Sequence, residues 1–191
     1  MNLAYHLILA SKSPRRKELL NSLGLTFSIE TYPVEETFHE DIHSNEVAEF
    51  LAIKKAKGFR TLQNTELLIT ADTTVIHEGV VLGKPENRDE AIAMISSLSD
   101  GRHEVVSGVC LKTTQKEISF SERTYVNFKP LTTEEIEYYV DQYKPFDKAG
   151  AYGIQEWIGM IGIRSIEGDY YNVVGLPLQG LYHRLKTEFN A

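Results

Sequence analysis

Two serines and two arginines lie within six residues near the start of the chain, where they could bind an anion. The residues are Ser11, Ser13, Pro14, Arg15 and Arg16. Serine before proline is typical of a helix start, and the first N–H groups of a helix attract anions. Two guanidinium groups at the positive end of a helix dipole cost stability unless an anion compensates them. The pattern predicts a phosphate site, with a solvated basic turn as the alternative.

The apolar pattern predicts an alternation of strands and helices that would position this site. Short apolar runs between turn residues indicate strands, and apolar residues three or four positions apart indicate helices. The expected strands cover residues 3–10, 26–32, 66–71, 104–112, 117–128, 157–163 and 170–174, and residues 75–82 form an extended segment around a turn at Glu78 and Gly79. The expected helices cover residues 14–23, 44–58, 89–99 and 132–143, and a final helix begins at Pro177. Thr132 and Glu135 are spaced to form a capping box at the start of the helix over 132–143. A strand–helix–strand start followed by a long hairpin indicates an α/β fold that mixes parallel and antiparallel pairing.

A carboxylate follows one of these expected strands. Asp72 comes directly after the apolar run that ends at Ala71. In open α/β sheets, ligands bind beyond the carboxyl ends of the strands, so Asp72 is a candidate for ligand binding, with a helix or turn cap as the alternative. Lys54, Lys55 and Lys57 lie in the last turns of the second expected helix, where the dipole favours cations, and spacing alone singles out none of them.

The segment 147–155 contains too much glycine and charge for a core element and too many polar groups for a simple linker. We therefore expect a functional loop. Its last residue, Gln155, carries an amide that both donates and accepts, so it could pair with the imide edge of thymine or uracil. Such a site would reject cytosine by leaving polar groups unpaired. The alternative is a loop glutamine that bonds to nearby backbone.

Composition narrows the class of protein. A chain of 191 residues with 42% hydrophobic residues fits one domain over residues 1–191, or two closely joined lobes. Cys110 is the single cysteine, which is typical of a reducing cytoplasm. No run approaches the roughly 18 apolar residues of a membrane span, and the net charge of -7 opposes general binding to nucleic acid. We expect a soluble cytoplasmic protein without a membrane or nucleic-acid partner.

Four segments, in this order and spacing, resemble the Maf family of nucleoside triphosphate pyrophosphatases over nearly the whole chain. They are Ser-Lys-Ser-Pro-Arg-Arg-Lys-Glu-Leu-Leu at 11–20, Ala-Asp-Thr at 71–73, Gly-Lys-Pro at 83–85 and the loop at 147–155. The resemblance implies a central mixed, twisted sheet flanked by helices, with a cleft between two lobes, similar to inosine triphosphatases. It also implies cleavage between the α- and β-phosphates. The Ala-Asp-Thr and Gly-Ile-Gln segments resemble the branch that acts on dTTP and UTP rather than the branch that acts on 7-methyl-GTP.

Match to the family pattern implies roles for single positions. It makes Asp72 the proton acceptor. It assigns the choice of base to Arg15, Thr73 and Gln155. Further polar positions of the cleft align with Glu35, Lys55 and Lys84.

The chemistry of triphosphate cleavage is consistent with these roles, because charge must be neutralised and a water placed in line with the α-phosphorus. The cations expected around the phosphates are Arg15, Arg16, Lys55 and Lys84. Glu35 and Asp72 could hold Mg²⁺, with Mn²⁺ as the alternative. An ordinary aspartate is a weak base, so we expect the metal to be required.

Two positions depart from the family pattern. Lys12 stands where small residues are common, and Glu156 with Trp157 follows Gly-Ile-Gln where glycine is frequent. The first adds a cation near the expected phosphates, and the second adds bulk beside the expected base pocket. Two alternatives to a dTTP and UTP pyrophosphatase remain, a 7-methyl-GTP pyrophosphatase of the same family and a nucleotide-binding regulator of cell division. A homodimer is a family-level expectation.

Overall fold

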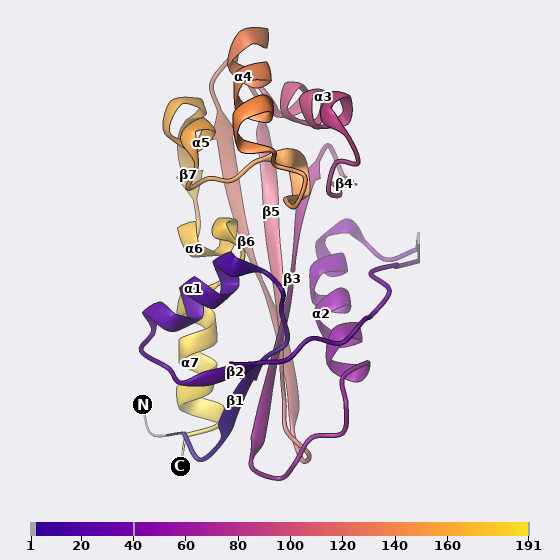
Figure 1. Ribbon diagram of the computed structural model, residues 1–191, viewed down its shortest axis with the longest axis vertical. Helices are drawn as coiled ribbons and strands as arrows, with labels where there is room; N and C mark the ends of the chain where they lie inside the picture. The colour runs from indigo at the N-terminus through magenta and orange to yellow at the C-terminus, as the bar shows by residue number, and fades with distance from the viewer. Residues whose placement is uncertain (1–2, 40, 191) are drawn as a thin grey trace. The chain divides into compact units, whose positions relative to one another are not determined.

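The computed structural model describes residues 3–39 and 41–190. These residues form an α/β fold with seven strands in one mixed sheet, in the order β2-β1-β3-β5-β6-β7, with β4 paired to β3 (Figure 1). The strands are β1 (His6–Leu9), β2 (Phe27–Ile29), β3 (Glu66–His77), β4 (Val80–Leu82), β5 (Arg102–Lys112), β6 (Glu117–Phe128) and β7 (Ile163–Glu167). β1 is parallel to β2 and β3, whereas β3–β4 and β6–β7 are antiparallel, which confirms the predicted mixed sheet.

Helices flank the sheet. They are α1 (Pro14–Ser22), α2 (Val47–Lys57), α3 (Arg88–Leu98), α4 (Thr133–Tyr143), α5 (Trp157–Gly162), α6 (Tyr170–Val174) and α7 (Leu178–Glu188), with short 3-10 turns η1 (Ser44–Glu46) and η2 (Ala149–Ala151). Among the helices of the described residues, none combines the length and hydrophobicity needed to cross a membrane.

The chain divides into two compact units. The first unit comprises Met1–Thr73, Ser107–Glu122 and Gly175–Ala191, and the second comprises Thr74–Val106 and Arg123–Val174. Strands β3, β5 and β6 contribute residues to both. Each unit has a hydrophobic core built from its own residues.

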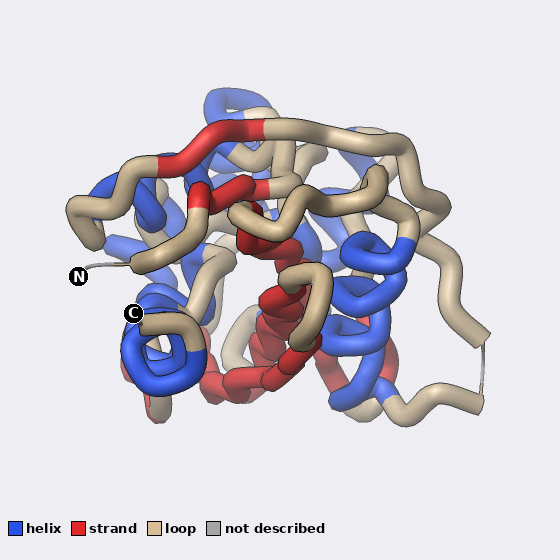
Figure 2. The backbone as a smooth tube through the Cα atoms, turned by 90° about the horizontal axis from the view of Figure 1, so that it is seen from below, coloured by secondary structure: helices blue, strands red, loops and turns tan. Residues whose placement is uncertain are grey.

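The first unit has a separate core on each face of its strands. Leu7 and Leu9 of β1 pack in a core with α1 and α7, whereas Ile8 packs with Leu68 of β3 and Ala52 of α2 in the other core. Both views show α2 and α7 on opposite sides of these strands (Figure 1, Figure 2). Successive side chains of a strand alternate between faces, so the sequence period of two decides which helix each residue meets.

The second unit is centred on α3 and α4. Thr132 and Glu135 form a complete capping box at the start of α4, as predicted. β3 and β4 turn at Glu78 and Gly79, whose φ angles of 50° and 81° lie in the left-handed region, and this confirms the predicted turn. Left-handed angles at both central residues suit the twist of a two-residue hairpin.

Three sequence predictions were wrong about element type or extent. β3 runs on to His77 instead of ending at Ala71, because antiparallel pairing with β4 continues the strand. The segments 157–163 and 170–174 were expected as strands, but α5 and α6 occupy them. Periodicity cannot separate strand from helix over five or six residues. In α6, buried Asn172 donates to the Val105 carbonyl oxygen at 3.0 Å and the Thr124 hydroxyl at 2.9 Å.

Candidate active site

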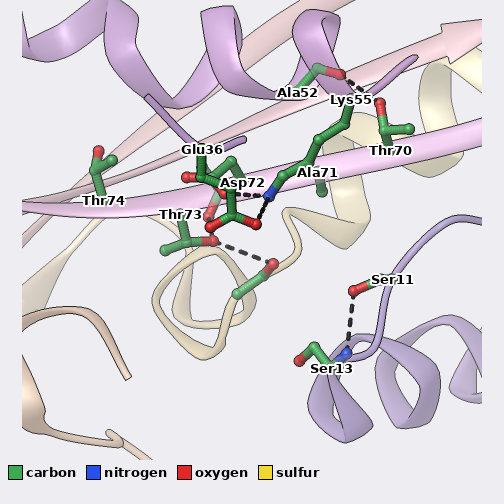
Figure 3. A network of polar contacts seen from close by, with 12 residues as sticks. Ser11, Ser13, Glu36, Ala52, Lys55, Thr70, Ala71, Asp72, Thr73 and Thr74 are labelled. Carbon is green, nitrogen blue, oxygen red and sulfur yellow. Dashed lines mark hydrogen bonds and ion pairs between the residues drawn. The ribbon is translucent and has the colours of Figure 1, made fainter. Parts of the chain in front are cut away.

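The start of α1 is built as the sequence predicts. The Ser13 hydroxyl accepts from the Arg16 backbone N–H at 3.4 Å, and the Ser13 N–H donates to the hydroxyl of buried Ser11 at 3.2 Å (Figure 3). Pro14 occupies the first turn, where Arg15 also lies. A serine hydroxyl that accepts in such a bond can still donate its own proton to an anion. The predicted helix cap is therefore confirmed, and phosphate binding there stays a prediction.

Arg16, one of the cations expected around the phosphates, bonds to protein oxygens in the structure. Its Nε donates to the carbonyl oxygen of Gly175 at 2.9 Å, Nη1 donates to that of Ala71 at 2.9 Å, and Nη2 donates to the Thr73 hydroxyl at 3.1 Å. Burial lowers the pKa of Arg16, and the carboxylate of Asp72 is the largest influence opposing that shift. The guanidinium therefore binds within the first unit, on the face of β3 that packs against α1.

Asp72 lies on the other face of β3. Its carboxylate Oδ1 is 2.5 Å from Nζ of Lys55, which comes from α2, and the same Nζ is 2.9 Å from Oε1 of Glu36 (Figure 3). The Asp72 and Lys55 side chains are 12% and 15% exposed, whereas that of Glu36 is 48% exposed. One ammonium thus joins two carboxylates. This brings together Lys55 and Asp72 among the predicted residues.

Glu36 was missed by the sequence analysis, which selected its neighbour Glu35. Glu35 is exposed, and the ion pair with Lys55 belongs to Glu36. Lys54 helps to hold this loop, because its Nζ donates to the carbonyl oxygen of Thr37 at 2.8 Å and to the Thr37 hydroxyl at 3.0 Å. A run of two glutamates in a loop has no period that could show which one faces α2.

Thr73 has partners that its position in the sequence does not reveal. Its hydroxyl lies 2.8 Å from that of Ser107 on β5 and 3.3 Å from the carbonyl oxygen of Gly175, in addition to the bond from Arg16. Gly175 adopts a φ of 130°, which favours glycine. No motif in the sequence marks Ser107. For Gly175, a glycine placed before Leu-Pro is a local feature that could have drawn attention to the position.

The second unit contains the other predicted site residues, Lys84 and Gln155. Both are exposed. The N–H of Gly150 donates to the carbonyl oxygen of Gly83 at 3.0 Å, so the loop at 147–155 and the Gly-Lys-Pro segment are in contact within this unit. Gly150 and Ala151 have φ angles of 66° and 59°, and a left-handed alanine marks a conformation that its surroundings must hold in place.

Glu156, the departure from the family pattern, anchors this loop. Its carboxylate accepts from the Tyr139 hydroxyl and lies 3.1 Å from Nζ of Lys148, which is buried. The Tyr139 oxygen also accepts from the Gly153 N–H at 3.0 Å. Burial, together with the Glu156 carboxylate, raises the pKa of Tyr139. The Tyr139 hydroxyl thus ties α4 to the residues around Gln155.

The donor set in the first unit fits a hard divalent cation. Mg²⁺ is usually held by one or two carboxylates together with phosphate oxygens and water, and Asp72 and Glu36 supply two carboxylates. Within the part of the chain that the structure describes, no three His, Cys, Asp or Glu side chains form a metal-binding group. The remaining ligands would have to be phosphate oxygens and water.

Comparison with known proteins agrees with the motifs. The model of the family described as Maf-like protein matches residues 6–188. A dTTP/UTP pyrophosphatase of Bacteroides thetaiotaomicron is 52% identical over 184 residues, which cover 95% of each chain. Proteins of the same name from Christiangramia forsetii and Porphyromonas gingivalis are 48% and 46% identical, over 98% and 95% of this chain and 96% and 94% of theirs. The resemblance expected from the sequence is confirmed, and the chain belongs to the family of Maf-like proteins.

Proposed function

We propose that this chain is a nucleoside triphosphate pyrophosphatase that hydrolyses dTTP and UTP to the monophosphate and pyrophosphate. Relatives named for that activity align with nearly the whole chain at about half identity, which supports both the reaction and the branch. The structural observation that carries the proposal is the position of Lys55 between the Asp72 and Glu36 carboxylates. This group combines a base, a cation and a second carboxylate within the first unit.

In the proposed reaction, Asp72 accepts a proton from water as the water oxygen attacks the α-phosphorus. The bond from that phosphorus to the bridging oxygen breaks, and the oxygen leaves with its electron pair as part of pyrophosphate. Ser11 and Ser13 bind phosphate oxygens at the positive end of α1, because hydroxyl donors and the helix dipole favour anions. Arg15, Lys55 and Lys84 neutralise the charge of the triphosphate.

We further propose that the reaction requires Mg²⁺, with Mn²⁺ as the alternative. Asp72 and Glu36 are the residues that would hold the ion, and the exposed Glu35 is the original candidate for the second position. When bound, the ion neutralises phosphate charge and lowers the pKa of a coordinated water. Lys55 already holds both carboxylates near one point, so their side chains lose little conformational freedom when the ion binds.

Base selection is assigned to Gln155, with Arg15 and Thr73 contributing. Gln155 is exposed, and its amide Nε2 would lie 3.1 Å from a Cβ on Gly153, so the side chain lies close to the loop backbone. An amide in this position offers a donor and an acceptor to the imide edge of thymine or uracil. We expect discrimination against CTP to depend on Gln155.

We also propose that the protein acts in the cytoplasm, where hydrolysis would remove unwanted pyrimidine triphosphates from the nucleotide pool. Cys110 is buried, and burial raises the pKa of its thiol to about 12, which makes thiol chemistry ineffective at neutral pH. We expect neither nucleic acid nor membrane as a partner, and a homodimer is the expected assembly. Light scattering on the purified protein measures that assembly.

The first test is a substrate panel. Purified protein is incubated with Mg²⁺ and dTTP, UTP, CTP, GTP or 7-methyl-GTP, and the release of pyrophosphate and monophosphate is measured. Metal-dependent turnover of dTTP and UTP without orthophosphate supports the proposal. Activity confined to 7-methyl-GTP would reverse the branch. Binding without turnover of any triphosphate would favour the nucleotide-binding regulator.

A further inference from the structure

Arg16 bonds to the two residues that flank Asp72. Nη1 donates to the carbonyl oxygen of Ala71, and Nη2 donates to the hydroxyl of Thr73. The Thr73 side chain lies on the face of β3 opposite the Asp72 carboxylate, which points to Lys55 (Figure 3). A planar guanidinium has its N–H groups in a fixed fork, so two such bonds fix the orientation of the strand segment between them.

The same side chain ties a third segment to this point. Nε donates to the carbonyl oxygen of Gly175, and the Thr73 hydroxyl lies 3.3 Å from that same oxygen. The start of α1, the middle of β3 and the residue that follows α6 therefore meet at one guanidinium. At least three of its five N–H groups are used in these bonds.

The acceptors of Arg16 are neutral, because they are two carbonyl oxygens and one hydroxyl. Its charge is favoured through space by the carboxylates of Asp72 and Glu36. Arg16 and Lys55 thus place two cations near two carboxylates, which offset part of the local positive charge before substrate arrives. A cation held in this way is already partly compensated, which lowers its gain from binding phosphate.

Arg15 is placed differently. Consecutive residues of an α-helix are rotated by about 100°, so Arg15 and Arg16 leave α1 in different directions. The neighbouring arginines can therefore have separate tasks, one at the phosphates and one behind β3.

We propose that Arg16 is a positioning residue, which holds Asp72 and the Thr73 hydroxyl in place from behind β3 and does not bind the phosphates. Because the Thr73 oxygen accepts from Arg16, its proton is directed to Ser107 or to the Gly175 carbonyl oxygen. Thr73 then influences the choice of base through its position and packing. The inference about catalysis depends on the proposed pyrophosphatase activity, whereas the inference about β3 does not.

The test compares Arg16→Lys with Arg15→Lys, since lysine keeps the charge and loses the fork. Four quantities are measured: kcat and KM for dTTP, the Kd of the non-hydrolysable analogue α,β-methylene-dTTP, and hydrogen–deuterium exchange of β3. We expect Arg16→Lys to lower kcat by about 100-fold, with about threefold or less change in Kd, because misplacement of a catalytic group by about 1 Å has that effect. Arg15→Lys should instead raise the Kd and leave exchange in β3 unchanged.

Exchange at residues 70–74 should be faster in Arg16→Lys than in the unaltered protein. If Arg16→Lys raises the Kd as Arg15→Lys does while exchange in β3 stays slow, Arg16 is a phosphate ligand and the proposal fails. Unchanged kcat, Kd and exchange would also overturn it. Absence of turnover on every triphosphate would refute the proposed pyrophosphatase activity. The exchange experiment would still decide whether Arg16 holds β3 in place.

Thr73→Val provides a second route if Arg16→Lys does not fold. It removes one acceptor of Arg16 and keeps the shape of the side chain. We expect faster exchange in β3 and a shift in the ratio of kcat/KM for dTTP to that for CTP. When both variants fold, the effect of Arg16→Lys on this ratio should be smaller in the Thr73→Val background, because the two residues act through one bond. Strictly additive effects would contradict the proposal.

Discussion

Asp72 and Thr73 are consecutive in β3, yet they bond to helices on opposite faces of the sheet. The Asp72 carboxylate meets Lys55 of α2, and the Thr73 hydroxyl meets Arg16 of α1. The alternation of a β-strand thus separates a catalytic candidate from a specificity candidate that the sequence places side by side.

Replacement of Asp72 by Asn should abolish most turnover. The amide keeps the size of the side chain but cannot accept the proton of the attacking water, and we expect kcat for dTTP to fall by at least about 100-fold. Binding of α,β-methylene-dTTP should persist. The exposed Asp89 in the first turn of α3 offers a matched control, since Asp89→Asn should leave kcat unchanged. Near-normal turnover in Asp72→Asn would remove Asp72 from the mechanism.

Glu35 and Glu36 form a matched pair for the second carboxylate. Because Glu36 contacts Lys55, we expect Glu36→Gln to raise the Mg²⁺ concentration needed for half-maximal activity by about 10-fold or more, as expected for a lost metal contact. Glu35→Gln should have a smaller effect. Titration of both variants with MgCl₂ at saturating dTTP measures the difference. A larger effect of Glu35→Gln would restore the assignment made from the motif.

Local signals predicted several of these features correctly. The cap of α1 at Ser13 and the capping box of Thr132 with Glu135 involve residues three apart, so the sequence contains both partners in one view. The hairpin of β5 with β6 also follows from local alternation. Motif resemblance added Asp72 and Lys55, which the fold brings into contact. These features depend on short separations or on a pattern already known.

The contacts on the face of β3 that packs against α1 could not be predicted in the same way. Arg16 and Gly175 are 159 positions apart, and Thr73 and Ser107 are 34 apart. No period or motif connects such residues, and only the folded sheet with α1 and α7 brings them together. Electrostatic reasoning at the helix start was right that two adjacent arginines need compensation. For Arg16 the bonded acceptors are protein oxygens, which the helix pattern alone does not reveal.

Tyr139→Phe should loosen the loop that carries Gln155. The change removes the hydroxyl that bonds to Glu156 and to the Gly153 N–H, and we expect about 1–3 kcal/mol of lost stability. It should also lower the preference for dTTP over CTP. Tyr138→Phe is the control from the same helix, because Tyr138 is half exposed. Thermal unfolding measures the loss of stability, and competition between dTTP and CTP measures the substrate preference. Equal selectivity in both variants would leave Tyr139 with a role in stability alone.

The stability of the second unit should depend on the protonation of His103. This residue is buried with its Nε2 2.7 Å from the Tyr152 hydroxyl, and burial, aided by His77, lowers its pKa from 6.5 to about 3. Between these pH values the unfolded chain binds a proton that the folded chain does not, so this contribution to stability is lost as pH falls below 6.5. The slope approaches about 1.4 kcal/mol per pH unit for one proton. Denaturant unfolding of His103→Gln between pH 7.5 and 4.5 should show a shallower slope than the unaltered protein. Parallel curves for the two proteins would mean that His103 becomes protonated without resistance in the folded state.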